Sequence, residues 1–249
     1  MNQKKRFYKL LGVGLIILLW WFLSSNFGFT GMILSPVSTM SRIYMEMQSN
    51  YFWISIFRTF SDIFASFLFG LICAFVASIT ALRFKNFRYI LAPVVTTLRS
   101  APTIAVITVL ILILPLDYIT TSISFLVIFP LLFENLLASL ECAPTSEIQA
   151  AKSLGLSFSS CVAHIYIPNA FSLIFANIIS AFGLNYKVVI AAEILGRSSI
   201  PSIGSNILTA KQSLDFSGSF IWLVISILLA FVFDFITSKV YKVVDSSIG

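Results

Sequence analysis

Charged side chains are scarce in this sequence, and histidine and cysteine are scarcer still. Only 10% of the 249 residues are Asp, Glu, Lys or Arg, whereas 58% are hydrophobic. A soluble domain of this size needs far more charge to cover its surface, which excludes an ordinary water-soluble globular protein. The single histidine, His164, excludes a multi-histidine metal site, and three widely spaced cysteines give no disulfide framework. The solvent of most of the chain is therefore predicted to be a lipid bilayer.

The sequence also lacks the pattern G-x-x-x-x-G-K-[ST], so it has no phosphate-binding loop of its own. No catalytic constellation is present, and neither an enzymatic activity nor a cofactor or metal is expected. Lys and Arg number 16 against 10 acidic residues. We assign this surplus to membrane topology rather than to nucleic-acid binding, because cytoplasmic loops of membrane proteins collect positive charge.

What the sequence does contain is a series of apolar segments, each long enough for a helix that crosses the ~30 Å hydrocarbon core. We predict an all-α, polytopic membrane protein with one domain, residues 1–249, and about six spans. The first span could instead be a cleavable signal peptide, but its end has no small-x-small cleavage pattern and favours a retained anchor. The predicted spans are about 10–25, 57–82, 91–115, 118–139, 169–195 and 219–241.

The distribution of Lys and Arg predicts the orientation of these spans. With the N-terminus inside, the inner segments hold 11 basic residues, the outer segments hold 4, and Lys187 lies within a span. This imbalance places both termini in the cytoplasm. It also makes residues 140–168 the longest cytoplasmic loop.

The polar part of this loop, "SEIQAAKSLGLSFSSCVAHIYIP", occupies residues 146–168. Ser146 followed by Gln149 fits a capping box at the start of a helix, and Glu147 in the first turn complements the helix dipole. Ala150 and Ala151 are helix-forming residues without bulk.

Gly155 fits the position just after a helix end, where a left-handed conformation is required. Ser157 is placed to cap a second short helix that runs to about Ile165, and Pro168 fits the start of the next span. The segment is predicted to be a helix–glycine–helix hairpin. By its physical chemistry alone it could be an interfacial connector or a docking element for a partner.

A resemblance favours docking. The spacing E-x-x-A-A-x-x-x-G-(nine residues)-I-x-x-P resembles the cytoplasmic signature loop of permease subunits of bacterial ABC importers, although Ile148 replaces the first alanine of the usual triplet. The residues that carry this pattern, and that the resemblance assigns to coupling with an ATPase, are Glu147, Ala150, Ala151, Gly155, Ile165 and Pro168.

Three further blocks are similar to permeases of the nitrate, sulfonate and taurine group, and they occur in the same order. They are "LRSAPTIAVITVL" (98–110), "FPLLFENLLASL" (129–140) and "GLNYKVVIAAEILGRSSIPSIGSNI" (183–207).

The resemblance implies that two permease subunits, in a homodimer, form the pathway within the cytoplasmic (inner) membrane. Each would dock its loop helix on an ABC ATPase subunit and receive a small polar solute from an extracytoplasmic substrate-binding protein. Glu147 would then orient the first turn, the alanines would keep the contact face flat, and Gly155 would permit the turn and a close approach. Sulfonates, nitrate, taurine and thiamine-precursor pyrimidines all remain open as solutes.

Polar residues inside the predicted spans are candidates for the pathway. Glu193 could line a gate, or it could pair with Arg197 four residues later on the same helical face. Lys187 could face a wet cavity or extend its amine toward the membrane surface. Asp234 is predicted to lie at the interface near the inner end of its span.

Two other functions are open. A self-contained secondary transporter or channel would need its own midplane site on broken helices, and the polar residues do not cluster at midplane. A membrane assembly factor would explain a large cytoplasmic hairpin but not the ordered match over four blocks.

Overall fold

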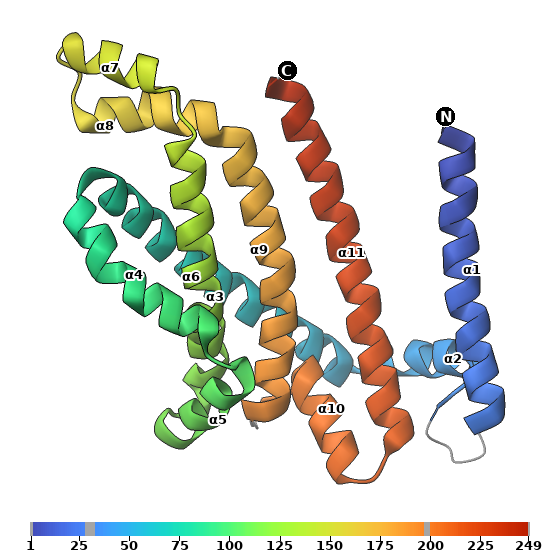
Figure 1. Ribbon diagram of the computed structural model, residues 1–249. Coiled ribbons are helices and arrows are strands. Elements are labelled where there is room, and N and C mark those ends of the chain that lie inside the picture. Colours follow the sequence, from blue (N-terminus) through green and yellow to red (C-terminus); the bar gives the residue numbers. More distant parts are fainter. Residues whose placement is uncertain (1, 28–32, 197–199, 249) are drawn as a thin grey trace.

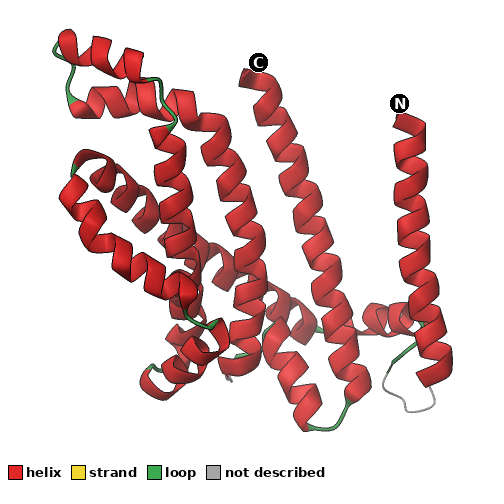
Figure 2. Ribbon diagram, viewed as in Figure 1, coloured by secondary structure: helices red, strands yellow, loops and turns green. Residues whose placement is uncertain are grey.

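The computed structural model describes residues 2–27, 33–196 and 200–248, and in these ranges it contains helices and loops but no strand (Figures 1 and 2). The all-α, polytopic fold class is thus confirmed. The helices are α1 (Asn2–Phe27), α2 (Pro36–Glu46), α3 (Asn50–Arg83), α4 (Lys85–Ser100), α5 (Thr103–Ile113), α6 (Leu116–Glu141), α7 (Thr145–Ser153), α8 (Phe158–Cys161), α9 (Ile167–Gly196), α10 (Ile203–Gln212) and α11 (Phe216–Ile248).

Four helices are long and apolar enough to cross a membrane: Asn50–Arg83, Tyr118–Glu141, Phe158–Gly196 and Phe216–Tyr241. They agree with four of the six predicted spans. In α1 the apolar part, Leu11–Asn26, forms a shorter apolar helix.

The apolar segment predicted as a span over residues 91–115 is not one straight helix but a bent pair of helices. Helices α4 and α5 meet at an angle of 100°. Ala101 at the junction has an extended backbone, with φ −67° and ψ 131°. Pro102 explains the break, because it disfavours a helical conformation of the residue before it and lacks the N–H that would continue the helix.

The centre of the protein is the packing of α3, α6 and α9. Helix α3 presents small residues at helical spacing, which lets the neighbouring backbones approach closely. Its buried face consists of Phe52, Ser55, Thr59, Ile63, Ser66, Phe67, Gly70, Ala74, Ser78 and Ala81. Ser78 donates its hydroxyl to the carbonyl of Phe133 in α6 at 3.0 Å, so this face also binds α6 through a polar contact.

Helix α4 packs against α6 through two ion pairs, Arg88–Glu141 and Arg99–Glu134. Helix α11 packs against α9 through the rings of Phe182 and Phe233, whose centroids lie 5.5 Å apart. These contacts hold the outer helices on the central group.

Both chain ends lie at the same end of the molecule as α7 and α8, while α2 and α10 lie at the other end (Figure 1). The loop of residues 140–168 and both termini therefore share one side, as the count of basic residues requires. Which side faces the cytoplasm stays a prediction.

Candidate functional site

The hairpin begins with α7, which starts two residues earlier than the predicted capping box requires. Pro144 occupies the N-cap position and makes no side-chain cap. Ser146 therefore lies within the first turn, where its hydroxyl cannot cap the helix, and the predicted Ser146–Gln149 box is wrong. Glu147 does lie in the first turn, as predicted.

The turn after α7 has the geometry that the sequence predicted. Gly155 has φ +73°, the left-handed conformation. Its N–H donates to the carbonyl of Lys152 at 3.0 Å, and the Leu156 N–H donates to the carbonyl of Ala151 at 3.0 Å. This pair of bonds is a Schellman motif, which reverses the chain sharply. Ser157 then caps α8 by accepting the Ser160 N–H at 3.2 Å.

The second helix of the hairpin does not end near Ile165, which is a further correction. It continues through a π-helical turn, Val162–Tyr166, into α9, so that residues 158–196 form one long helix. Pro168 explains the turn, because its ring clashes with the carbonyl four residues earlier and it has no N–H. The Ile167 N–H instead bonds to the carbonyl of Val162, five residues back.

A side-chain bridge fixes the angle between α7 and the start of α9. Asn169 donates from Nδ2 to Oε2 of Glu147 at 2.9 Å and to the carbonyl of Ile165 at 2.9 Å. Glu147, Ile165 and Asn169 thus form a single hydrogen-bonded group. The bridge gives Glu147 a role in holding the two arms of the hairpin together.

The two alanines of the hairpin have different environments. Ala151 is buried, whereas Ala150 is exposed. Leu154, with 80% of its surface exposed, and Leu156 are uncovered apolar side chains beside the glycine turn. The hairpin therefore has an inner face closed by Ala151 and an outer apolar tip.

Glu193 lies at the junction of three helices at the opposite end of the protein from the hairpin. Its side chain is 1% exposed. Oε2 accepts hydrogen bonds from the hydroxyl of Thr59 in α3, at 3.0 Å, and from the backbone N–H of Gly204 in α10, at 2.9 Å. The Thr59 hydroxyl in turn accepts the N–H of Ile203 at 3.0 Å. Glu193 and Thr59 together satisfy two N–H groups at the start of α10.

Arg197 lies outside the described residues, so the predicted Glu193–Arg197 pair is not described either. Gly204 explains how close α10 comes to α9. A Cβ at position 204 would lie 2.4 Å from Cβ of Glu193 and 2.8 Å from the carbonyl oxygen of Ile190. Only glycine fits at this contact.

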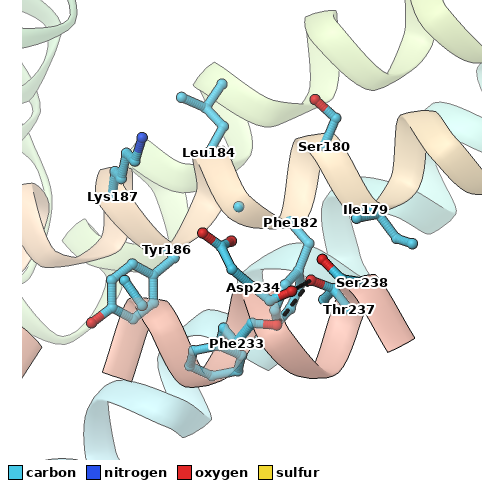
Figure 3. A pocket seen from close by; sticks show the side chains of 12 residues that line it. Ile179, Ser180, Phe182, Leu184, Tyr186, Lys187, Phe233, Asp234, Thr237 and Ser238 are labelled. Atoms are coloured by element: carbon cyan, nitrogen blue, oxygen red, sulfur yellow. Dashed lines mark hydrogen bonds between the residues drawn. The ribbon is translucent and has the colours of Figure 1, made fainter. Parts of the chain in front are cut away.

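Lys187 is exposed on α9 and lines a pocket between α9 and α11 (Figure 3). It does not lie beside Glu193: six residues separate the two along the helix, and Glu193 is buried in the junction with α3 and α10. The two candidate pathway residues are therefore at different sites.

Sequence reasoning missed three residues that join helices. Asn185 is fully buried, accepts the hydroxyl of Ser124 in α6 and donates to the carbonyl of Ile63 in α3 at 3.0 Å. Asn206 in α10 donates to Ser55 in α3. Thr59 completes the group. The available signal was amide and hydroxyl side chains in or beside apolar segments, where each needs a partner.

The solved structures that share this fold include those of three ABC transporters. An inward-facing MetNI methionine ABC transporter is 14% identical with a TM-score of 0.64, covering 76% of this chain and 94% of its own. An amino acid ABC transporter crystallised with histidines is 14% identical with a TM-score of 0.65, covering 80% and 96%. A bacterial ABC transporter involved in import of the acidic polysaccharide alginate is 14% identical with a TM-score of 0.69, covering 96% of each chain.

The chain thus shares its fold with chains of these ABC transporters. No curated protein sequence matches the chain significantly. The sequence model of the family described as "Binding-protein-dependent transport system inner membrane component" matches residues 66–246, and the chain belongs to this family. It is a permease subunit of the ABC importer type.

Proposed function

We propose that this chain forms half of the translocation pathway of an ATP-driven importer and that residues 140–168 dock on a separate ATPase subunit. The observation that supports the docking most directly is the built hairpin. A Schellman turn at Gly155 and the Glu147–Asn169 bridge hold α7 in a fixed position at one end of the protein, with Leu154 and Leu156 uncovered. An exposed apolar tip on a fixed helix is suited to a groove on a partner protein.

The other partners follow from the family. A second copy of the chain would complete the pathway as a homodimer, and an extracytoplasmic binding protein would deliver the solute. The surplus of basic residues on the hairpin side supports cytoplasmic placement of the hairpin and both termini. ATP hydrolysis belongs to the ATPase subunit, since this sequence has no phosphate-binding loop.

The proposed solute is small and polar, in the range that the resemblance implies: a sulfonate, nitrate, taurine or a thiamine-precursor pyrimidine. Glu193 and Lys187 are the proposed pathway and gate residues. Glu193 is buried in this conformation, so a gating role requires the junction of α3, α9 and α10 to open.

Affinity purification of the tagged chain from its native membrane tests this function. An ATPase subunit should co-purify with it. Leu154→Asp should reduce the amount of ATPase, because a carboxylate would be buried in the docking groove. Leu214→Asp is the matched control, since Leu214 is also exposed but lies in the turn between α10 and α11 at the other end of the protein. Solute uptake driven by an ion gradient in vesicles without any ATPase would contradict the proposal and favour a secondary transporter.

A further inference from the structure

A pocket of about 470 Å³ lies between α9 and α11 (Figure 3). Its apolar wall includes the rings of Phe182 and Phe233. The lining also includes six side chains that carry polar groups: Ser180, Tyr186, Lys187, Asp234, Thr237 and Ser238. A volume of this size is typical of a site for a small molecule, with a few polar groups set in an apolar wall.

Lys187 and Asp234 lie within the candidate membrane spans Phe158–Gly196 and Phe216–Tyr241. Lys187 lies nine positions before Gly196 and Asp234 lies seven before Tyr241, which are the last residues of these candidate spans among the residues that the structure describes. At 1.5 Å per residue both are about 10 Å or more from those ends. Both side chains are exposed. A charged group facing hydrocarbon is strongly disfavoured, so water, a polar solute or another protein surface must cover both side chains when the chain is in the membrane.

The two opposite charges share the pocket without forming an ion pair. In the part of the chain that the structure describes, the ion pairs are Arg58–Asp62, Arg88–Glu141 and Arg99–Glu134. The Asp234 carboxylate reaches from α11 toward α9, while Lys187 projects from α9 at one end of the pocket (Figure 3). Each charge is thus available to a ligand.

The hydroxyl of Thr237 leaves both charges available to a ligand. Thr237 already donates its hydroxyl to the carbonyl of Phe233 at 2.8 Å, so it offers a ligand only acceptor lone pairs. A ligand that pairs with these three side chains must therefore carry a donor near Asp234 and Thr237, and an acceptor near Lys187.

We propose that this pocket binds a small zwitterion, with Lys187 holding its anionic group and Asp234 its ammonium group. The proposal deepens the proposed function, on which it rests, by naming the class of solute. A simple anion such as nitrate, or a sulfonate without an amine, would satisfy Lys187 but leave Asp234 beside a like charge. The pocket would therefore discriminate against such anions.

The test uses the chain with its ATPase in lipid nanodiscs and three probes that share a two-carbon skeleton. Taurine carries both charges, isethionate only the sulfonate, and ethanolamine only the ammonium. Ser180→Cys places an exposed thiol in the pocket lining, and the chain without this substitution gives the background from native cysteines. Taurine should slow maleimide labelling of Ser180→Cys at concentrations roughly tenfold or more below those needed for isethionate or ethanolamine.

Two charge-removing variants should each change the protection given by a different probe. Asp234→Asn should make isethionate as protective as taurine, because the repulsion of its sulfonate is removed. Lys187→Gln should make ethanolamine as protective as taurine, because the repulsion of its ammonium group is removed. Lys211→Gln, an exposed lysine of α10 outside the pocket, should change nothing.

Equal protection by all three probes would overturn the proposal. Protection that is the same in Asp234→Asn and Lys187→Gln as without these substitutions would also overturn it. If Ser180→Cys stays unlabelled and Lys187→Cys cross-links to a second copy of the chain, the pocket is a contact between protomers and the proposal is also wrong. Failure of the proposed function would appear differently, as the absence of an ATPase from the purified complex, so the two failures can be distinguished.

Discussion

Glu193 and Gly204 approach each other so closely that the backbone N–H of Gly204 donates to Oε2 of Glu193 at 2.9 Å, with no room for a side chain at position 204. This contact ties α10 to α9. Thr59 extends it to α3, since its hydroxyl donates to the same carboxylate oxygen. Two consecutive helices and α3, whose Thr59 lies 134 positions before Glu193, therefore meet at one buried carboxylate.

Gly204→Ala should destabilise the protein by about 1–3 kcal/mol, since the added methyl group would overlap both Glu193 and the α9 backbone. Thermal unfolding of the detergent-purified chain would show the loss as a lower midpoint. Gly12→Ala in α1 is the control, because a Cβ there has no neighbour within 4 Å. Equal midpoints for Gly204→Ala and the wild type would mean that α10 does not pack this closely.

Glu193→Gln should leave folding and ATPase binding intact, since one amide oxygen can still accept from Thr59 and Gly204. On the gate hypothesis solute uptake should fall, because the charge that becomes hydrated when the junction opens is lost. An independent measurement is labelling of Glu193→Cys with a membrane-impermeant maleimide, which should change when ATP and binding protein shift the conformational populations. Normal uptake by Glu193→Gln, together with labelling that does not change when ATP and binding protein are added, would leave the carboxylate a purely structural role.

Gly155→Val should abolish transport while membrane insertion stays normal. A β-branched residue strongly disfavours φ +73°, so the turn between α7 and α8 would open and displace α7 from its docking position. Nothing lies within 4 Å of the Cβ position, so the penalty comes from the backbone rather than from crowding.

Gly155→Asn provides the matched control for the turn, because asparagine tolerates the left-handed conformation. It should retain most transport and most ATPase co-purification. Full transport by a well-inserted Gly155→Val variant would show that the hairpin is not needed for coupling.

Topology reporters fused after Arg88, Lys152 and Gly249 should be cytoplasmic, and one fused after Thr209 should be external. The expectation rests on the ratio of 11 inner to 4 outer basic residues. Residues near 150 should resist protease added to the outside of intact cells. Cleavage there would reverse the orientation.

Much of this protein could be predicted from its sequence, because the physical rules involved act locally. Apolar length defines the long helices α3, α6, α9 and α11. The left-handed turn at Gly155 and the cap by Ser157 depend on single residues and their immediate neighbours, and both were predicted.

The errors arose where two local signals competed. Pro102 broke an apolar run long enough to be a span, and Pro144 moved the start of α7 so that Ser146 no longer caps it. Pro168 gave a π-helical turn instead of a helix boundary, because the helix could widen and keep most of its hydrogen bonds.

The sequence by itself determined the helices, the hairpin turn and, through the family pattern, the class of protein. Only the tertiary structure decided which polar residues meet. Glu193 joins Thr59, 134 positions earlier, and Asn185 joins Ile63 and Ser124. Lys187 and Asp234 line one pocket between α9 and α11, and Lys187 does not join Glu193. Such partners depend on how the helices rotate and cross, and that is set by packing over their whole length rather than by any short stretch of sequence.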